Sequence, residues 1–430
     1  MTSDDPVVIV GMAVEAPGGV DTADKYWTLL SEQREALGPF PTDRGWPIRE
    51  IIEGSQRDGF KRIHDLGGFL DTATEFDPEF FGISPREAVA MDPQQRVALR
   101  IGWRAIENAG INPDDLGGHD VGCYVGASLT GFGNDLAEFT DHTGHLITGT
   151  ALGVISGRIA YTLDLAGPAL TIDSSCASAL VAFNVAVSAV RSGDCSMALA
   201  GGVCVMGSPG FFVEFAKQHA LSDDGRCRPY SAHATGTVWA EGAAMFLLQK
   251  RSGALRDGRT ILAEVRASCV NQDGRTTGLT APSGTAQARL FRRAIDISGV
   301  HLDEVGMVEG HGTGTSLGDR TELGSLARTY GAGTPRRGPL LGSVKSNVGH
   351  SQAAAGALGL AKVLVSAQRA TIPPTLHVDE PSRAIEWESQ GLRLADKLTP
   401  WPAVDGRRIA AVSAFGMSGT NAHAIVAVPG

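Results

Sequence analysis

Short apolar segments bounded by glycine recur along the chain, and they limit the possible folds more than any other feature of the sequence. In the first half they cover residues 7–10, 121–126, 169–172, 197–200 and 243–248. Apolar runs of this length between turn residues are typical of buried strands. Glycine supplies 55 of the 430 residues, about twice its usual share of roughly 7%. We therefore expect many tight turns between the strands.

Longer segments, with apolar residues three and four positions apart, alternate with these strands and predict helices. They cover residues 94–108, 177–191 and 285–297. The second half repeats the alternation, with strands expected at residues 261–265, 306–309, 340–344, 408–413 and 422–428. This order predicts an α/β fold with covered sheets and suggests two similar halves. Residues 43–61, rich in charge and without periodicity, are expected to form an irregular surface excursion.

Charge and hydropathy argue against several partners and locations. Lys and Arg total 37 against 47 Asp and Glu, a net charge of −10, which disfavours binding to nucleic acid or to an acidic membrane surface. No uninterrupted apolar run approaches the roughly 18–20 residues of a membrane helix. The first six residues lack the basic and apolar regions of a leader peptide. We therefore expect a cytoplasmic protein that does not enter a membrane.

The six cysteines are scattered, without a Cys-x-x-Cys pair or a His/Cys cluster at zinc spacing, so neither disulfides nor a metal site is expected. Cys176 differs from the others because it stands where the strand at 169–172 meets the helix at 177–191. Unpaired amides at a helix start lower the pKa of a thiol and favour its thiolate. Taken alone, this segment leaves open the alternative of an inert buried cysteine.

Two histidines, His311 and His350, stand in glycine-dense turns that also follow predicted strands and precede predicted helices. Functional groups collect at the carboxyl ends of strands in α/β sheets, so the three turns can converge on one pocket. A single histidine in such a turn would more often be structural. Two in matching contexts beside a matching cysteine favour a catalytic site.

Together with other ordered motifs, these turns resemble the ketosynthase branch of the thiolase-like superfamily, specifically the polyketide synthase type of 3-oxoacyl (beta-ketoacyl) carrier-protein synthase. The resemblance covers nearly the whole chain. Its further motifs lie at residues 7–12, 17–19, 80–87, 91–96, 156–158, 271–274, 279–282 and 415–423. So many motifs in one order are specific, whereas a lone Gly-His-Gly would carry no weight.

The resemblance implies a thiolase-like fold, with two similar α/β halves that form a layered α-β-α-β-α sandwich. Residues 1–255 would form the half that carries the nucleophilic Cys176, and residues 256–430 the half that carries His311 and His350, in one compact unit. The implied reaction is a decarboxylative Claisen condensation of a Cys-bound acyl group with a malonyl-type extender, in polyketide or related fatty acyl biosynthesis. No cofactor would be bound, because substrates arrive on the phosphopantetheine arm of an acyl carrier protein.

The resemblance also implies roles for individual residues. Both histidines would stabilise the enolate formed on decarboxylation. Lys345 would order the histidine pair, and the backbone amides of Cys176 and Met417 would form an oxyanion hole for the acyl carbonyl. Asn421 and the glycine-rich loop at 416–419 would shape the gate between carrier arm and cysteine. Cys227, in a polar loop, matches a structural stretch and is not expected to be catalytic.

The chain departs from the family pattern at several positions without losing a catalytic side chain. The nucleophile is flanked by Ser174-Ser175 and Ala177-Ser178, where the family commonly has Thr-Ala and Ser-Ser. Gly310 replaces an alanine before the first histidine, and residues 318–322 read Gly-Asp-Arg-Thr-Glu instead of Gly-Asp-Pro-Ile-Glu. These changes bear on the acyl pocket and the rate. Met417, where elongating fatty-acid relatives carry Phe, favours the polyketide side.

The expected partners are an acyl carrier protein acting in trans and a second copy of the chain. A homodimer is predicted because relatives pair through a strand beside the nucleophile, and because residues 195–205 would otherwise leave an apolar sheet edge. The Met1 start and the lack of a carrier or docking segment favour a discrete enzyme over a module fragment. Three alternatives remain: a non-extending ketosynthase-like partner, an acyltransferase that uses the same cysteine, and a cysteine hydrolase.

Overall fold

The apolar segments of the first half form strands at their predicted places. The protein is described by a computed structural model that covers residues 5–133, 144–332 and 338–430. The leader-peptide prediction rests in part on residues 1–4, which lie outside these ranges. The first-half strands are β1 (Val7–Glu15), β2 (Val121–Gly126), β3 (Ala169–Ile172), β4 (Met197–Cys204) and β5 (Gly242–Lys250).

The second half supplies the remaining strands of a mixed sheet. They are β6 (Ala263–Gln272), β7 (Val305–Glu309), β8 (Leu340–Gly342), β10 (Arg393–Leu394), β12 (Arg407–Phe415) and β13 (Thr420–Pro429). Within the described residues the eleven strands follow the order β10-β8-β7-β12-β13-β6-β1-β5-β4-β2-β3. If β6, β7, β8, β12 and β13 are matched to β1 to β5, both halves have the same strand order. The two halves predicted from the order of elements are therefore confirmed. The short strands β9 (Thr371–Ile372) and β11 (Thr399–Pro400) pair separately.

The three predicted helices are present as α4 (Pro93–Asn108), α7 (Ser178–Ser192) and α10 (Gly284–Ser298). The other α-helices are α1 (Ala23–Ser31), α2 (Ile48–Gly54), α3 (Pro85–Ala90), α5 (Leu146–Thr150), α6 (Val154–Thr162), α8 (Gly210–Lys217), α9 (Arg251–Arg256), α11 (Ser316–Ala327), α12 (Lys345–Val348) and α13 (Ala355–Gln368). Three 3₁₀ turns complete the set within the described ranges: η1 (Pro113–Leu116), η2 (Leu302–Glu304) and η3 (Gln352–Ala354).

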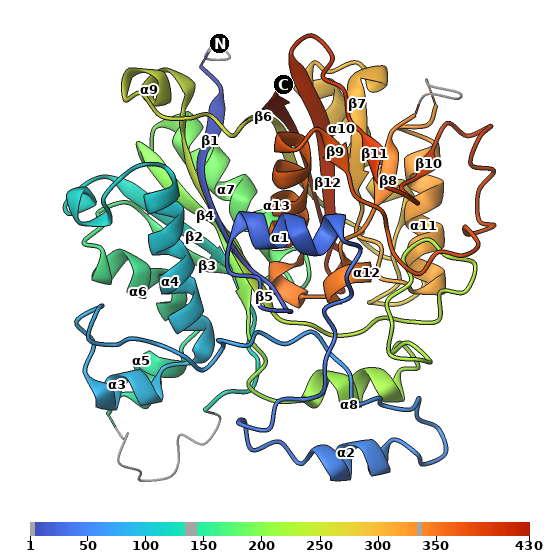
Figure 1. Ribbon diagram of the computed structural model, residues 1–430, viewed down its shortest axis with the longest axis horizontal. Coiled ribbons are helices and arrows are strands. Elements are labelled where there is room, and N and C mark those ends of the chain that lie inside the picture. Colours follow the sequence, from blue (N-terminus) through green and yellow to red (C-terminus); the bar gives the residue numbers. More distant parts are fainter. Residues whose placement is uncertain (1–4, 134–143, 333–337) are drawn as a thin grey trace.

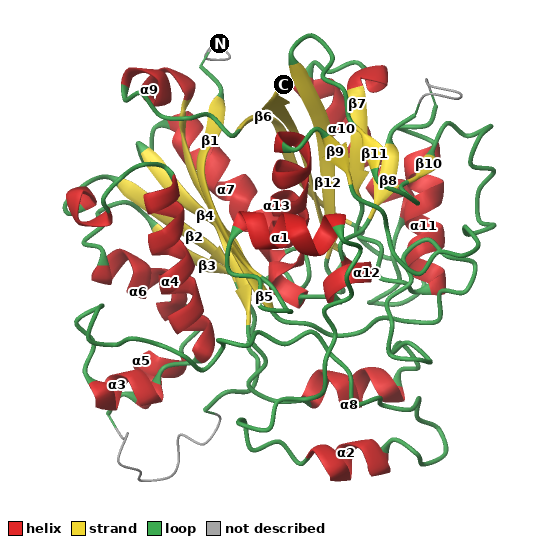
Figure 2. Cartoon of the chain, viewed as in Figure 1, coloured by secondary structure: helices red, strands yellow, loops and turns green. Residues whose placement is uncertain are grey.

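The helices form layers around the two halves of the sheet (Figures 1 and 2). Helices α4 and α6 cover the outer face of the first-half strands, and α10 and α11 lie beyond the second-half strands. Helices α7 and α13 lie between the halves, where they share one apolar core with strands of both. This layering confirms the thiolase-like α/β architecture.

Helix α7 belongs to a long apolar segment of the described chain. Among the described residues, one segment, 175–192, which ends with α7, is long and apolar enough to cross a membrane by length and composition. More than half of that segment is buried inside the protein, and it packs between the strands of both halves. Its composition is that of a core helix, as expected for an element covered on several sides.

Three sequence predictions about surfaces and burial are wrong, the last of them in part. Residues 195–205 do not form a sheet edge, because β4 lies between β2 and β5 and is buried along its length. The edge strand of the first half is β3, expected to be buried, on which Leu170 is 47% exposed. The excursion at 43–61 is not irregular throughout, since it contains α2. Its Arg44 pairs with the buried carboxylate of Glu241.

Candidate active site

The cysteine lies at a strained turn between β3 and α7. Cys176 precedes the first residue of α7 by two positions, where the sequence placed it, and Ser175 before it has a φ of 56°. A φ in the left-handed region is uncommon for serine and marks a constrained turn. The Ser175 amide donates to Asp173 Oδ1 (2.9 Å), and Ser178 Oγ donates to the Ser175 carbonyl (2.5 Å). These bonds hold the turn so that Cys176 faces a cavity, whereas the other five cysteines are buried.

Burial dominates the ionisation of this thiol, so the prediction of a lowered pKa is wrong. Removal from water raises the pKa of Cys176 from 9.0 to about 11. The Lys345 ammonium and the backbone amides of Cys176 and Met417 act in the opposite direction but are outweighed. The resting group is therefore a thiol, which would have to lose its proton before it could act as a nucleophile.

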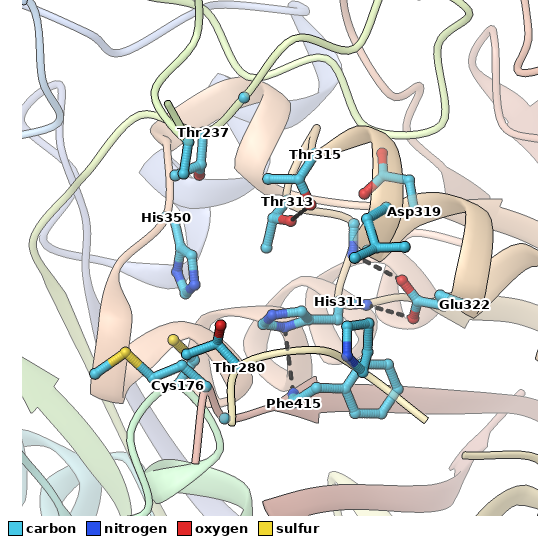
Figure 3. Close-up of a pocket in the computed structure, with 18 of the residues that line it drawn as sticks. Cys176, Thr237, Thr280, His311, Thr313, Thr315, Asp319, Glu322, His350 and Phe415 are labelled. Carbon is cyan, nitrogen blue, oxygen red and sulfur yellow. Dashed lines mark hydrogen bonds between the residues drawn. The ribbon is translucent and has the colours of Figure 1, made fainter. Parts of the chain in front are cut away.

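Each histidine of the pair accepts a hydrogen bond from a backbone amide. The Phe415 amide donates to His311 Nδ1 (3.4 Å), and the Gln352 amide donates to His350 Nδ1 (3.1 Å). An accepting Nδ1 places the ring proton on Nε2. Burial, reinforced by the Lys345 ammonium, holds the pKa of both rings well below 6.5, so both are neutral. The rings stand at 85° with centres 5.4 Å apart and border the space above Cys176 (Figure 3).

Lys345 lies behind His311 and does not line the cavity. Its side chain is buried, and its Nζ donates to the carbonyl oxygen of His311. Burial lowers the pKa of Lys345, and the carboxylate of Glu309 is the largest opposing influence. Glu309 also accepts from the Val344 amide (2.6 Å) and pairs with the buried Lys362 (Oε2 to Nζ, 2.7 Å). The hydrogen bond from Val344 to Glu309 links the end of β7 to the segment that follows β8, close to the turn that carries His311.

The glycine-rich turn between β12 and β13 closes against the cysteine elbow. The Gly416 amide donates to the Thr420 carbonyl (2.7 Å), and the Gly419 amide donates to the Gly416 carbonyl (2.9 Å). A Cβ on Gly416 would lie 2.2 Å from the Ser174 carbonyl oxygen, so only glycine allows this approach. The backbone amide of Met417 therefore reaches the cysteine sulfur, while its side chain is 45% exposed at the cavity rim.

A cavity of about 510 Å³ brings most of the predicted site residues together. Cys176, both histidines, Met417 and Asn421 line it. The Asn421 amide is buried and donates to Asp273 Oδ1 (2.7 Å), which ties the end of β13 to the loop after β6. Hydroxyl groups are frequent in the remaining lining. They belong to Thr235, Thr237, Thr280, Thr313, Thr315 and Ser316.

Two buried carboxylates, to which the sequence analysis gave no role, hold the histidine turn. Glu322 accepts the amides of His311 (2.8 Å) and Gly312 (2.9 Å), and Asp319 accepts the amide of Gly314 (3.2 Å). Both carboxylates lie on α11, three residues apart, so they emerge from one face of the helix. In the sequence, two acidic residues three positions apart, shortly after the glycine-rich turn of His311, are the feature from which this role could have been predicted.

The described residues contain no group of three or more His, Cys, Asp or Glu side chains that could hold a metal ion. The cavity presents one thiol and two neutral imidazoles, with the backbone amides of Cys176 and Met417 at the sulfur. This arrangement, on a sheet whose halves share one strand order, is that of the thiolase-like acyltransferases.

The chain belongs to the beta-ketoacyl synthase family. Residues 4–254 match the family model of the beta-ketoacyl synthase N-terminal domain, and residues 262–379 match that of the C-terminal domain. It is similar to the ketosynthase from module 6 of the bacillaene synthase of Bacillus subtilis 168. That structure has a TM-score of 0.90 and 36% sequence identity, and the match covers 99% of this chain and 72% of that one.

Two curated relatives are large polyketide synthases. Erythronolide synthase EryA3 of Saccharopolyspora erythraea is 49% identical over 430 residues, which is 99% of this chain and 14% of the relative. Polyketide synthase GfsB of Streptomyces halstedii is 48% identical over 425 residues, which is 98% of this chain and 8% of the relative. The chain therefore spans only a small part of the length of these relatives.

Proposed function

We propose that the chain is a ketosynthase that joins a Cys176-bound acyl group to a malonyl-type extender, in polyketide or related fatty acyl biosynthesis. The observation that carries this proposal is the convergence of Cys176, His311 and His350 from three separate turns on one cavity. A hydrolase of the Ser-His-Asp kind needs one basic histidine oriented by an acid. Here two neutral histidines each accept at Nδ1 and present Nε2–H, which suits stabilisation of a developing oxyanion.

In the first half-reaction, Cys176 takes the acyl group from the carrier. The thiol loses its proton, the sulfur attacks the acyl thioester, and the bond between the acyl carbon and the carrier arm breaks. The arm leaves as a thiolate, which takes up the proton that Cys176 lost and becomes a thiol, so no net proton is lost. The backbone amides of Cys176 and Met417 form the oxyanion hole for the tetrahedral oxygen, because both lie at the sulfur.

In the second half-reaction, the malonyl group on a carrier arm loses carbon dioxide, and the electron pair of the broken C–C bond forms a thioester enolate. His311 and His350 donate from Nε2 to the enolate oxygen. The enolate carbon attacks the acyl-Cys176 carbonyl, and the bond to sulfur breaks. The released thiolate regains a proton, and the β-keto thioester stays on the carrier.

The supporting residues hold the backbone of the site in place through hydrogen bonds. Lys345 fixes the His311 carbonyl, and Asn421 with the Gly416–Gly419 turn shapes the gate beside the cysteine. Phosphopantetheine contains two amides, and the hydroxyl groups of the cavity suit that arm. No separate cofactor takes part. Residues 1–255 and 256–430 are the two halves of one unit, since Cys176 comes from the first and both histidines from the second.

The proposed partners are an acyl carrier protein in trans and a second copy of the chain, in the cytoplasm. The dimer surface is assigned to β3, because this strand is the edge of the first half and exposes Leu170. An unpaired edge with an exposed apolar side chain favours pairing with another strand. The net charge of −10 gives no reason to expect nucleic acid as a partner.

The test is incubation with an acyl carrier thioester, followed by addition of a malonyl carrier thioester. Intact mass and peptide mapping should place the acyl group on Cys176, and the second addition should release carbon dioxide and yield a β-keto thioester. The Cys176→Ser variant should not condense, whereas the matched Cys227→Ser variant should. Acylation followed only by hydrolysis would indicate a hydrolase, and transfer without condensation an acyltransferase. Absence of acylation would indicate a non-extending partner.

A further inference from the structure

A buried tyrosine beneath the His311 turn is unusually constrained. Tyr230 is fully buried and has a φ of 61°, although it is not a glycine. Its backbone amide donates to Asp319 Oδ2 (2.7 Å), and its carbonyl accepts from the Ser382 amide (2.7 Å). A large side chain in the left-handed region persists only where its surroundings fix it. The ring is therefore aimed in one direction, toward the turn that carries His311.

The Tyr230 hydroxyl reaches the carboxylate that holds this turn. It donates to Glu322 Oε2 (2.9 Å), while Oε1 accepts the His311 amide and Oε2 also accepts the Gly312 amide. Burial raises the pKa of Tyr230 well above 10, so the hydroxyl keeps its proton and acts as a donor. The buried carboxylate thus has three donors, two from the histidine turn and one from the tyrosine. Bonds of this charged type are about twice as strong as neutral ones.

The same hydroxyl occupies the space where residue 310 would carry a side chain. A Cβ built on Gly310 would lie 1.9 Å from the Tyr230 hydroxyl oxygen and 3.0 Å from the ring carbon that bears it. A contact as short as the first does not occur without movement of one of the two atoms. Gly310 is the last residue before His311, and its amide donates to the Gly342 carbonyl (2.8 Å). This bond restrains the backbone at residue 310, so it cannot shift away from the hydroxyl without loss of the bond. The Tyr230 hydroxyl therefore fills the space that a side chain at residue 310 would need, and it fits there because residue 310 is glycine.

We propose that Tyr230 is a positioning residue for His311, matched to Gly310, and that it sets the direction of the His311 Nε2–H through Glu322. This inference rests on the proposed function of His311. It explains the glycine at the position where the family resemblance leads us to expect alanine. An alanine methyl group and the tyrosine hydroxyl compete for one volume, so this chain has a hydrogen bond to Glu322 where a methyl group would otherwise pack.

The test is a double-mutant cycle with Tyr230→Phe, Gly310→Ala and the combination of both. Two rates are measured for each protein: decarboxylation of a malonyl carrier thioester, which needs His311, and acylation of Cys176, which serves as the internal reference. Tyr230→Phe should lower kcat for decarboxylation on the order of tenfold, and Gly310→Ala on the order of 100-fold, the loss typical of a displacement of about 1 Å. Acylation should change by less than about threefold in both.

The double variant decides the matter. Without the hydroxyl, the methyl carbon introduced by Gly310→Ala still lies 3.0 Å from the ring carbon and 3.1 Å from Glu322 Oε1, contacts that small shifts relieve. The double variant should therefore decarboxylate at least about tenfold faster than Gly310→Ala alone. Tyr26→Phe is the matched control, since Tyr26 is also fully buried, its hydroxyl donates to the Leu358 carbonyl (3.0 Å), and it neither lines the cavity nor contacts Glu322. It should leave both rates unchanged. Melting temperatures of all variants separate loss of fold from loss of position.

Two results would overturn the proposal: a Tyr230→Phe variant with wild-type decarboxylation, or a double variant no faster than Gly310→Ala. Equal losses in acylation and decarboxylation would also overturn it, since they would show general damage to the cavity. If the wild-type protein neither acylates nor decarboxylates, the proposed function fails. If the wild type does both and the cycle shows no coupling, only the pairing of Tyr230 with Gly310 fails.

Discussion

The alkylation of Cys176 as a function of pH tests whether burial or the helix start controls its ionisation. Burial raises the pKa of the thiol from 9.0 to about 11. Only the thiolate reacts with iodoacetamide, so the rate follows the thiolate fraction, which grows with pH below the pKa. We expect the rate to rise about tenfold per pH unit between about pH 7 and 9.5, without a plateau.

The expected magnitude follows from the difference between the two pKa values. At about pH 8 a thiol with a pKa of 9.0 is roughly one-tenth thiolate, and one with a pKa of about 11 roughly one-thousandth. Cys176 should therefore react about 100-fold more slowly than a thiol at 9.0. Lys345→Met should slow the reaction further, because the Lys345 ammonium is the largest influence that lowers the pKa of Cys176.

The assay is intact mass after timed exposure to iodoacetamide, with peptide mapping of the product. The other five cysteines are buried and should not react in the folded protein, so Cys176→Ser serves as the blank. A plateau reached by about pH 8 would refute the reasoning. It would mean that the helix start and the amides of the elbow outweigh burial, and that the resting enzyme holds a thiolate.

The remaining predictions concern catalysis, assembly and stability. Cys176→Gln should release carbon dioxide from malonyl carrier without condensing, because decarboxylation needs only the histidines and a Gln amide resembles an acylated cysteine; a folded variant that releases none would contradict the separation of roles. His311→Ala and His350→Ala should each retain some self-acylation but lose condensation on the order of 100- to 1000-fold, measured as β-keto product; a wild-type rate would make that histidine structural. Leu170→Asp should convert a dimer to the 44.9 kDa monomer in light scattering, and a wild-type protein that is already monomeric would remove β3 as the dimer surface. Lys362→Met should lower the free energy of unfolding in urea by about 3–5 kcal/mol, because it removes the cation that pairs directly with the buried carboxylate of Glu309; an unchanged midpoint would show that the pair contributes nothing net.

Local patterns in the sequence predicted the positions of most strands and helices and of the turns that carry the site residues. The strands β2 and β3 have the bounds that the sequence predicted; α4 differs from prediction by one residue at its start, and α7 and α10 differ by one residue at each end. Apolar runs between glycines and three- to four-residue spacing are properties of neighbouring residues, so they can be read without knowledge of the fold. For the same reason Cys176 and His311 could each be placed at a strand end before a helix. The same prediction for His350 is wrong in part, because the short helix α12 separates His350 from β8.

The order of the strands within the sheet and the ionisation of Cys176 could not be predicted from local patterns of residues. The sequence does not show that β4 lies inside the sheet and β3 at its edge, because strand neighbours are set by contacts far apart in the chain. Nor does the sequence show that Cys176 is buried enough for the loss of water to raise its pKa by more than the amides at the helix start lower it. The cost of removing a charge from water depends on every element packed around it.

The sequence alone therefore determined the class of fold, the three side chains that we propose to be reactive and the glycine-rich turns near them, since each depends on a local pattern of residue types. The tertiary structure decided how these groups act. It placed Lys345 behind His311, set both imidazoles as Nε2–H donors through the amides of Phe415 and Gln352, and brought the Tyr230 hydroxyl into the space left by Gly310. Each of these depends on distances between residues separated by many positions, and only packing of the whole chain fixes such distances.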